Sequence, residues 1–435
     1  MRLLIPFLAL AICASTVVGA QTPNIIYVMA DDMGYGDLGC YGQKLIRTPN
    51  IDQLAAEGMR FTQFYSGCTV CAPARCCLMT GLHTGHAWVR DNKSSILERV
   101  PLRPEDFTVA ELLKKAGYST GVVGKWGLGE PETTGVPNKQ GFDYWFGYLN
   151  QAHAHSYYPD YLWRNEEKYT LEGNVNGQGK QYSHDLFTQE ALSFVERNKD
   201  KPFFLYLAYT IPHGKLEVPS DAPYSDRDWP QPCKNYAAMI TRQDADIGKL
   251  MKLLKDLKLD DRTLVFFCSD NGAPDGGGTL RHFSSNGPLR GTKGQLYEGG
   301  IRVPMIARWP GKIKAGAVSD QVWAMWDFLP TAAEVAGISP PKNIDGISML
   351  PALLSESQKQ HDFMYWEFNQ ANLVQAVRMG DWKAIKHNSG KIELYNLKSD
   401  VGETNNIAAE HPEILARIED YLKTARTESE YWPTR

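Results

Sequence analysis

The stretch Asn24-Ile25-Ile26-Tyr27-Val28-Met29-Ala30-Asp31-Asp32 decides the fold class of this 435-residue chain. Six apolar residues follow Asn24 without a break, which predicts a strand buried on both faces. Such strands are typical of parallel sheets that are covered by helices. The run ends at two adjacent aspartates, and the ligands of open α/β sheets bind beyond the carboxyl ends of the strands. The stretch therefore predicts a central strand and one edge of a functional site.

Similar apolar runs recur along the chain and alternate with segments of helical periodicity. Further strands, all expected to be parallel, are predicted at residues 119–123, 202–209, 263–268 and 304–307. Helices are predicted at residues 48–57, 108–116, 185–198, 235–257 and 327–336. This alternation indicates an α/β fold with a mostly parallel central sheet flanked by helices.

Charged or polar residues stand where four of the predicted strands end. Asp31 and Asp32 end the first, Lys125 the second, His213 follows the third, and Asp270-Asn271 end the fourth. A single polar strand end is common for solubility alone. Four at one edge of a parallel sheet indicate a shared site.

The acidic part of this set has the chemistry of a hard-cation site. Asp31, Asp32, Asp270 and Asn271 offer oxygen ligands only, which suits Ca²⁺ or Mg²⁺ better than Zn²⁺. Adjacent carboxylates repel each other, so a vicinal pair indicates either a bound cation or an exposed turn.

The C-terminal part of the chain has a different pattern from about residue 361. Short, half-buried strands are predicted at residues 363–368, 373–379, 382–386 and 393–396, followed by a helix at 410–425. We expect a main catalytic domain at 21–360 and a smaller C-terminal α+β subdomain at 361–435. Residues 151–183 and 271–300 are predicted to be long loops over the site.

The N-terminus has the pattern of a signal peptide over residues 1–20. Arg2 precedes an apolar run, and small residues precede Gln21. The run is short for a membrane span; a membrane anchor and a lipoprotein site at Cys13 are weaker alternatives. We therefore expect export, to the periplasm or outside the cell. The formal net charge of −4 gives no reason to expect a nucleic acid or an acidic membrane surface as a partner.

The eight cysteines include Cys13, and removing it with the signal leaves an odd number. An odd count in an exported protein indicates one cysteine with another role. Pro73 is well placed in the first turn of a predicted helix that would have Cys71 at its N-terminus. A helix N-terminus attracts anions, and Arg75 lies one turn further on.

The sequence around this cysteine resembles that of a known family. Cys71-Ala72-Pro73-Ala74-Arg75, followed by Leu78-Met79-Thr80-Gly81, is similar to the signature of type I, formylglycine-dependent sulfatases. Residues 31–38 and 269–272 resemble the two metal motifs of that family. The resemblance implies an alkaline-phosphatase-like fold. It also implies a maturation enzyme that oxidises Cys71 to formylglycine. The metal would be Ca²⁺, less favourably Mg²⁺, held by Asp31, Asp32, Asp270 and Asn271 together with residue 71.

Three further segments resemble family motifs: residues 124–129, 211–213 and 290–304. By this resemblance the catalytic residues are Cys71, Arg75, Lys125, His213 and Lys293. The two lysines would bind sulfate oxygens, with Lys293 and His213 near the leaving oxygen. The chain departs from the family at Gly127, where many members have a histidine that releases the sulfate. Glycine has no acid–base group, and His213, His86 and His184 are the alternatives for this role.

The resemblance implies a sulfuric ester hydrolase that removes sulfate from a sulfated carbohydrate or an aryl sulfate through a formylglycine sulfate ester. Two alternatives are a phosphodiesterase or phosphonate monoester hydrolase of the same superfamily, and a catalytically silent protein that binds sulfated glycans. Aromatic and imidazole groups crowd residues 144–163 and favour a carbohydrate, although ordinary packing explains such groups equally well. The candidate substrate-binding residues are His153, His155, His184 and Arg90.

Overall fold

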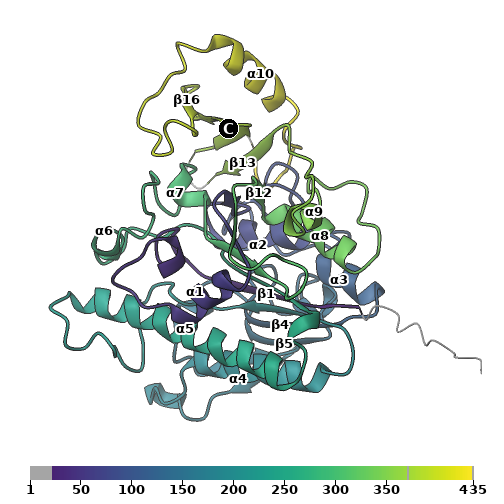
Figure 1. The fold of residues 1–435 in the computed structure, drawn as a ribbon, viewed down its shortest axis with the longest axis vertical. Helices are drawn as coiled ribbons and strands as arrows, with labels where there is room; N and C mark the ends of the chain where they lie inside the picture. The colour runs from purple at the N-terminus through teal and green to yellow at the C-terminus, as the bar shows by residue number, and fades with distance from the viewer. Residues whose placement is uncertain (1–21, 370–371, 434–435) are drawn as a thin grey trace, which may run out of the picture.

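The chain forms a three-layer α/β body that carries a smaller sheet on one side (Figure 1). The computed structural model describes residues 22–369 and 372–433, so the predicted signal peptide lies outside the described residues. Among these described residues no helix combines the length and the apolar composition that crossing a membrane requires.

The strands and α-helices have the following bounds. The strands are β1 (Asn24–Ala30), β2 (Met59–Phe61), β3 (Phe64–Tyr65), β4 (Ser119–Lys125), β5 (Tyr144–Tyr148), β6 (Tyr161–Arg164), β7 (Glu167–Thr170), β8 (Phe203–Ala208), β9 (Thr263–Ser269), β10 (Met305–Arg308), β11 (Ala317–Ser319), β12 (Trp323–Ala324), β13 (Met364–Phe368), β14 (Val374–Met379), β15 (Trp382–Lys386) and β16 (Ile392–Asn396). The helices are α1 (Pro49–Ala56), α2 (Cys71–Thr80), α3 (Val109–Lys115), α4 (Ser183–Asn198), α5 (Gln231–Asp256), α6 (Thr279–Phe283), α7 (Glu298–Ile301), α8 (Phe328–Val335), α9 (Leu350–Leu353) and α10 (Pro412–Leu422).

The central sheet of the described residues has ten strands in the order β11-β2-β10-β9-β1-β8-β4-β5-β6-β7. Its middle is parallel, because β1 pairs in parallel with both β8 and β9, and β4 pairs in parallel with β8 and β5. Every residue of β1 is buried, as its unbroken apolar sequence predicts.

Alternate residues of β1 enter two different hydrophobic cores. Ile25, Tyr27 and Met29 pack with residues of α2, α3 and α8 on one face. Ile26 and Val28 pack with residues of α1, α4 and α5 on the other face. Figure 1 shows α4 and α5 below the sheet and α2, α3 and α8 above it. The predicted doubly covered sheet is therefore confirmed.

One of the five predicted parallel strands runs in the opposite direction. The strand predicted at 304–307 is β10, and it pairs antiparallel with both β9 and β2. The segment between β9 and β10 stays at the edge where β9 ends, as the position of Lys293 there shows. A chain that re-enters a sheet from the edge it has just left must run antiparallel.

The predicted loop at 151–183 also needs correction. It contains β6 and β7, an antiparallel pair that extends the sheet beyond β5. The exposed side chains of β7 explain why the apolar pattern of a buried strand was absent there.

The C-terminal region forms a separate antiparallel sheet in the order β13-β14-β15-β16, with α10 packed against it. It meets the main body through a buried polar cluster. Lys383 Nζ lies 2.9 Å from Glu298 Oε1 and 2.9 Å from Glu403 Oε1, and all three side chains have no exposed surface. Because Glu298 begins α7, this cluster ties the C-terminal sheet to the segment that carries Lys293.

Candidate active site

The ends of four adjacent strands bring the candidate residues together. In the order β9-β1-β8-β4, these strands lead into Asp270, Asp31, His213 and Lys125. The register pairs Ala30 with Ser269, so the acidic residues that follow lie side by side. The Asp270 amide donates to the Ala30 carbonyl at 3.0 Å, and the Asp32 amide donates to Asp270 Oδ1 at 3.0 Å.

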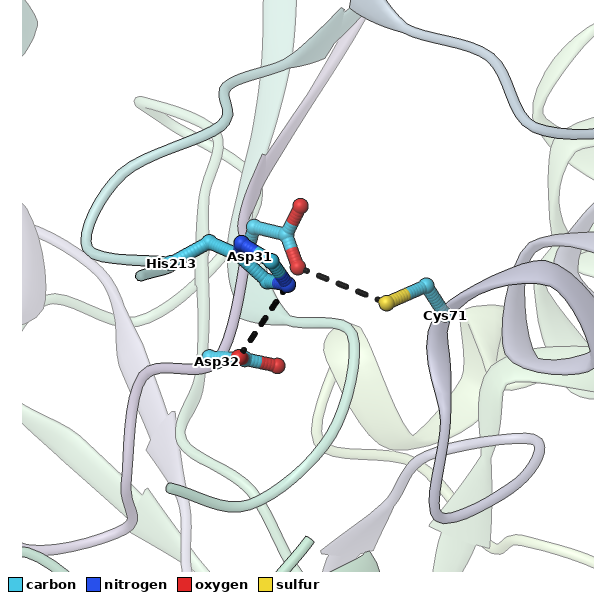
Figure 2. Close-up of side chains that lie close together, drawn as sticks. All are labelled: Asp31, Asp32, Cys71 and His213. Atoms are coloured by element: carbon cyan, nitrogen blue, oxygen red, sulfur yellow. Dashed lines mark hydrogen bonds and ion pairs between the residues drawn. The ribbon is translucent and has the colours of Figure 1, made fainter. Parts of the chain in front are cut away.

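Cys71 faces this edge from the first residue of α2. The helix ends at Gly81, whose left-handed φ of 72° provides its C-terminal turn. At the start of the helix, the Ala72 N–H donates a hydrogen bond of 2.9 Å to Asn92 Oδ1. The Cys71 thiol lies 3.6 Å from Asp31 Oδ1 (Figure 2). The structure therefore places the cysteine at a helix N-terminus beside the acidic pair, as its sequence predicts.

Basic side chains alternate with the carboxylates around Cys71. Arg75 Nη2 lies 2.8 Å from Asp270 Oδ2, and Lys125 Nζ lies 2.7 Å from Asp31 Oδ2. Lys293 Nζ lies 2.7 Å from Asp32 Oδ1 and 3.7 Å from the Cys71 sulfur. The ion pairs of Arg75 and Lys125 are fully buried, and Lys293 is half-buried, so each group depends on its partner for charge compensation.

His213 completes the cluster. Its Nε2 lies 3.6 Å from Asp32 Oδ2, as the second dashed line in Figure 2 shows. Burial lowers the pKa of His213 to about 4, although the Asp32 and Asp31 carboxylates act in the opposite direction. The ring of His155 stacks on that of His213 with centroids 4.8 Å apart.

The pKa values in this cluster follow from burial and from the charges around each group. Burial raises the pKa of Asp31, but Lys125, His213 and Arg75 outweigh it and hold that pKa far below its usual range. Burial and the neighbouring Asp31 carboxylate raise the pKa of Asp270 to about 7 despite Arg75. Burial also raises the pKa of the Cys71 thiol to about 12. An unmodified Cys71 is therefore a neutral thiol and a weak nucleophile.

The donor set fits a hard divalent cation. Ligand atoms of Asp31, Asp32, Cys71 and His213 lie within 4.8 Å of one another. The buried Oδ1 of Asn271 has no hydrogen-bond partner among the described residues. The Nδ2 of the same residue donates a hydrogen bond of 2.7 Å to Asp32 Oδ1. An unpaired buried oxygen beside paired carboxylates is the arrangement that an oxygen-preferring ion satisfies.

A pocket of about 340 Å³ opens in front of Cys71. Its lining includes His155, His213 and Lys293, and also Gln151, which the sequence prediction missed. Gln151 follows β5, a neighbour of β4 in the sheet. The rule that sites gather beyond strand ends identifies this position once β5 is recognised. The pocket-lining residues Asn92, Lys93, Glu98 and Arg99 carry no such local signal.

The structure places four candidates outside this pocket. His184 is fully buried, where its Nε2 lies 2.9 Å from Asp246 Oδ2. Arg90 is buried in an ion pair with Glu367 of the C-terminal sheet. His153 packs between Tyr148 and Tyr161, and His86 pairs with Asp345. Packing or ion pairing occupies the side chains of His153, His184 and Arg90, and none of the three lines this pocket. Their contact with substrate stays a prediction. Of the four predicted substrate contacts, His155 alone lines the pocket.

Cysteine pairing is absent from the described part of the chain. Cys40, Cys68, Cys71, Cys76, Cys77, Cys233 and Cys268 are all free. Cys71 thus carries no disulfide partner that would exclude another chemical role.

Fold and site together define a hydrolase of anionic esters, with basic groups and oxygen ligands gathered at the carboxyl edge of an α/β sheet. Comparison with protein families gives the particular family. The sulfatase family model matches residues 23–338, and the model of the N-sulphoglucosamine sulphohydrolase C-terminal region matches residues 292–428. The chain belongs to the sulfatase family and is a sulfuric ester hydrolase.

Individual relatives agree with this assignment. The chain is 37% identical to the N-acetylgalactosamine-6-sulfatase of Canis lupus familiaris, over 84% of this chain and 72% of the relative. It is 34% identical to the arylsulfatase A of Homo sapiens, over 94% of this chain and 89% of the relative. Among solved structures it resembles Ps i-CgsB in complex with k-i-k-neocarrahexaose, with a TM-score of 0.84, 31% identity and 95% of both chains covered.

Proposed function

We propose that the chain removes sulfate from a sulfated carbohydrate, with formylglycine made from Cys71 as the reacting group and Ca²⁺ as the metal. One observation carries the proposal. The side chains of Arg75, Lys125 and Lys293 converge around Cys71 at the N-terminus of α2. Their formal charges and those of Asp31, Asp32 and Asp270 cancel. Adding a divalent cation gives the site a net positive charge that suits a sulfate ester.

Each basic residue has a distinct part in holding the ester. Lys125 is fixed by Asp31 and Arg75 by Asp270, so their N–H groups are oriented before substrate binds. Lys293 and His213 both flank Asp32. We assign to these two residues the transfer of a proton at the leaving oxygen, because both also line the pocket in front of Cys71.

Two groups outside the encoded side chains complete the chemistry. A formylglycine hydrate at residue 71 supplies a hydroxyl nucleophile, in place of a thiol that burial keeps neutral. Asp31, Asp32, Asp270 and Asn271 would hold Ca²⁺, which supplies Lewis acidity next to that hydroxyl. Mg²⁺ suits the site less well, because it demands a more regular octahedral shell. Formylglycine implies a maturation enzyme as a transient partner.

A carbohydrate substrate has two supports. The relatives and structures named above include an N-acetylgalactosamine-6-sulfatase and a protein bound to an oligosaccharide. The pocket also offers Gln151 and His155 beside the charged cluster, and such side chains suit sugar hydroxyls. The signal-like N-terminus supports export of the protein to the compartment where extracellular glycans are met.

A substrate panel tests the proposal. The protein is produced together with a formylglycine-generating enzyme and supplied with Ca²⁺. Sulfate release is then measured from 4-methylumbelliferyl sulfate and from a set of sulfated saccharides that includes N-acetylgalactosamine 6-sulfate and carrageenan oligosaccharides. We expect turnover of the aryl ester and preferential turnover of at least one saccharide. Cys71→Ala is the matched inactive control.

The same preparation distinguishes the alternatives. Faster hydrolysis of bis(4-nitrophenyl) phosphate or of a phosphonate monoester than of any sulfate ester would reassign the reaction. Binding of a sulfated saccharide by calorimetry, without sulfate release from converted protein, would assign the chain to the silent glycan-binding class.

A further inference from the structure

Polar contacts hold the ring of His213 only loosely. Its Nε2 lies 3.6 Å from Asp32 Oδ2, the approach drawn in Figure 2, which is too long for a hydrogen bond. The same carboxylate lies 2.7 Å from Lys293 Nζ and accepts a hydrogen bond of 2.7 Å from Asn271 Nδ2. The Nδ1 of His213 is buried and has no hydrogen-bond partner among the described residues. Hydrogen bonds within the described structure therefore do not fix the plane of this imidazole.

A short segment beyond β5 contacts both the ring and the backbone of His213. His155 ends the 3₁₀ helix His153–His155, and its ring stacks on that of His213 with centroids 4.8 Å apart and an angle of 24° between the planes. Two residues later, the buried Tyr157 hydroxyl lies 2.7 Å from the His213 carbonyl oxygen and 2.8 Å from that of Thr210. The His213 amide itself donates to the Thr210 carbonyl at 3.1 Å. Residues 155–157 therefore hold the turn that carries His213 as well as its ring.

The stack and the Asp32 carboxylate constrain the His213 ring in different ways. Stacking with His155 fixes the plane of the ring, and the attraction to Asp32 determines which edge of the ring faces the pocket. His155 is exposed at the pocket that Cys71 lines. Removing its ring therefore leaves the buried carboxylates and basic groups of the site in place.

We infer that His155 is a positioning residue, whose ring holds the imidazole of His213 in the plane that directs Nε2 toward the leaving oxygen. The inference rests on the proposed function, which assigns proton transfer at that oxygen to His213 and Lys293. It gives His155 no proton to transfer, because the stack needs only the face of an aromatic ring. The correct orientation of a reacting group is itself a large part of its catalytic effect.

A double-mutant cycle tests whether His155 acts through His213. The variants are His155→Ala, His213→Ala and the two combined, each converted to formylglycine and supplied with Ca²⁺. The substrate is 4-methylphenyl sulfate, which lacks the sugar hydroxyls that the nitrogens of His155 could bind. We expect His155→Ala to lower kcat/KM at least about tenfold, as small misplacements of a reacting group do. In the His213→Ala background the same change should have no further effect. Equal losses in both backgrounds, or no loss in either, would overturn the inference.

The leaving group provides a readout that a purely structural role would not change. The 4-nitrophenolate ion leaves with little help from a proton, whereas 4-methylphenolate is more basic and needs that help. His155→Ala should therefore lower kcat/KM for 4-methylphenyl sulfate at least about fivefold more than for 4-nitrophenyl sulfate. An equal loss on the two esters would contradict a role at the leaving oxygen.

A conservative variant separates the ring from its nitrogens. His155→Phe keeps a stacking surface and should retain more than about half of the parent kcat/KM for 4-methylphenyl sulfate. A loss as large as that of His155→Ala would show that a nitrogen of His155 is required, and would overturn the inference. His411→Ala is the matched control, since His411 is a half-buried histidine that packs on Trp382 outside the pocket. Its kinetics should equal those of the parent, and equal thermal midpoints establish that all variants fold.

Failure of the proposed function is distinguishable from failure of this inference. The absence of sulfate release from 4-nitrophenyl sulfate by converted parent protein would refute the proposed function. An active parent protein in which the effects of His155→Ala and His213→Ala are additive would refute only the positioning role of His155.

Discussion

Gln151 occupies the space into which a side chain at Gly127 would extend. A Cβ at residue 127 would lie 2.6 Å from Gln151 Nε2, and Gly127 has a φ of +88°. The backbone conformation therefore favours glycine at this position, and any larger residue would also have to displace the end of the flexible Gln151 side chain. The local backbone therefore explains why residue 127 is glycine, where many members of the family have a histidine.

We predict that Gly127→His does not improve sulfate release. The left-handed φ makes any side chain there cost roughly 1–3 kcal/mol of stability, and the imidazole displaces Gln151 from the pocket. Denaturant unfolding and kcat/KM on the aryl ester measure the two effects. Gly127→His combined with Gln151→Ala should be less destabilised than the sum of the single changes. A single variant that is both as stable as the parent and more active would refute this explanation.

Removal of the Lys125 charge should reduce catalysis without changing the fold of the sheet edge. Lys125→Met leaves Asp31 without its 2.7 Å partner and removes one donor to the ester. A loss of about 10²–10³ in kcat is expected, comparable with the loss of one preorganised donor in other enzymes. Lys386→Met, a half-buried lysine outside the pocket, is the control. Wild-type kcat in Lys125→Met would remove this residue from the mechanism.

We predict that Asn271 is a ligand of the metal on which activity depends. Asn271→Ala removes the buried Oδ1 that has no hydrogen-bond partner among the described residues. Calorimetric Ca²⁺ affinity should fall at least about tenfold, as for other losses around a metal site. Chelation should abolish activity, and Ca²⁺ should restore it better than Mg²⁺. Equal Ca²⁺ affinity of the variant and the parent would show that Asn271 is not a ligand.

The C-terminal sheet should stabilise the catalytic edge through Lys383. Lys383→Met leaves Glu298 and Glu403 buried without their cation. Removing one partner of a buried ion pair costs about 3–5 kcal/mol of folding free energy, and we expect a loss of this size. Denaturant unfolding measures the loss. Lys386→Met on the same strand should change stability far less, because this half-buried lysine has no buried carboxylate partner among the described residues. Equal effects of the two substitutions would contradict a structural role for the cluster.

The sequence predicts the buried central strands, and the residues that follow them, better than it predicts the rest of the molecule. The buried strands and the residues that follow them are readable, because an unbroken apolar run has one favourable place in a covered parallel sheet. That rule places Asp31 beside Asp270 before any coordinates are known. The direction of β10 is not readable, since its sequence is that of a buried strand in either orientation.

Contacts between distant segments also escape sequence reasoning. The burial of His184 against Asp246 and of Arg90 against Glu367 depends on packing that no local pattern encodes. The same holds for a cavity of about 500 Å³ whose lining joins Asn92 of the main body to Asn388 of the C-terminal sheet.

The chemical form of residue 71 and the rate of sulfate release can be measured in the same samples. Protein is produced with and without a formylglycine-generating enzyme, and mass spectrometry of the peptide that contains residue 71 gives the converted fraction. We expect the rate of sulfate release to be proportional to this fraction and to fall to background when residue 71 is a thiol. Full activity of unconverted protein, or no sulfate release from fully converted protein supplied with Ca²⁺, would contradict it.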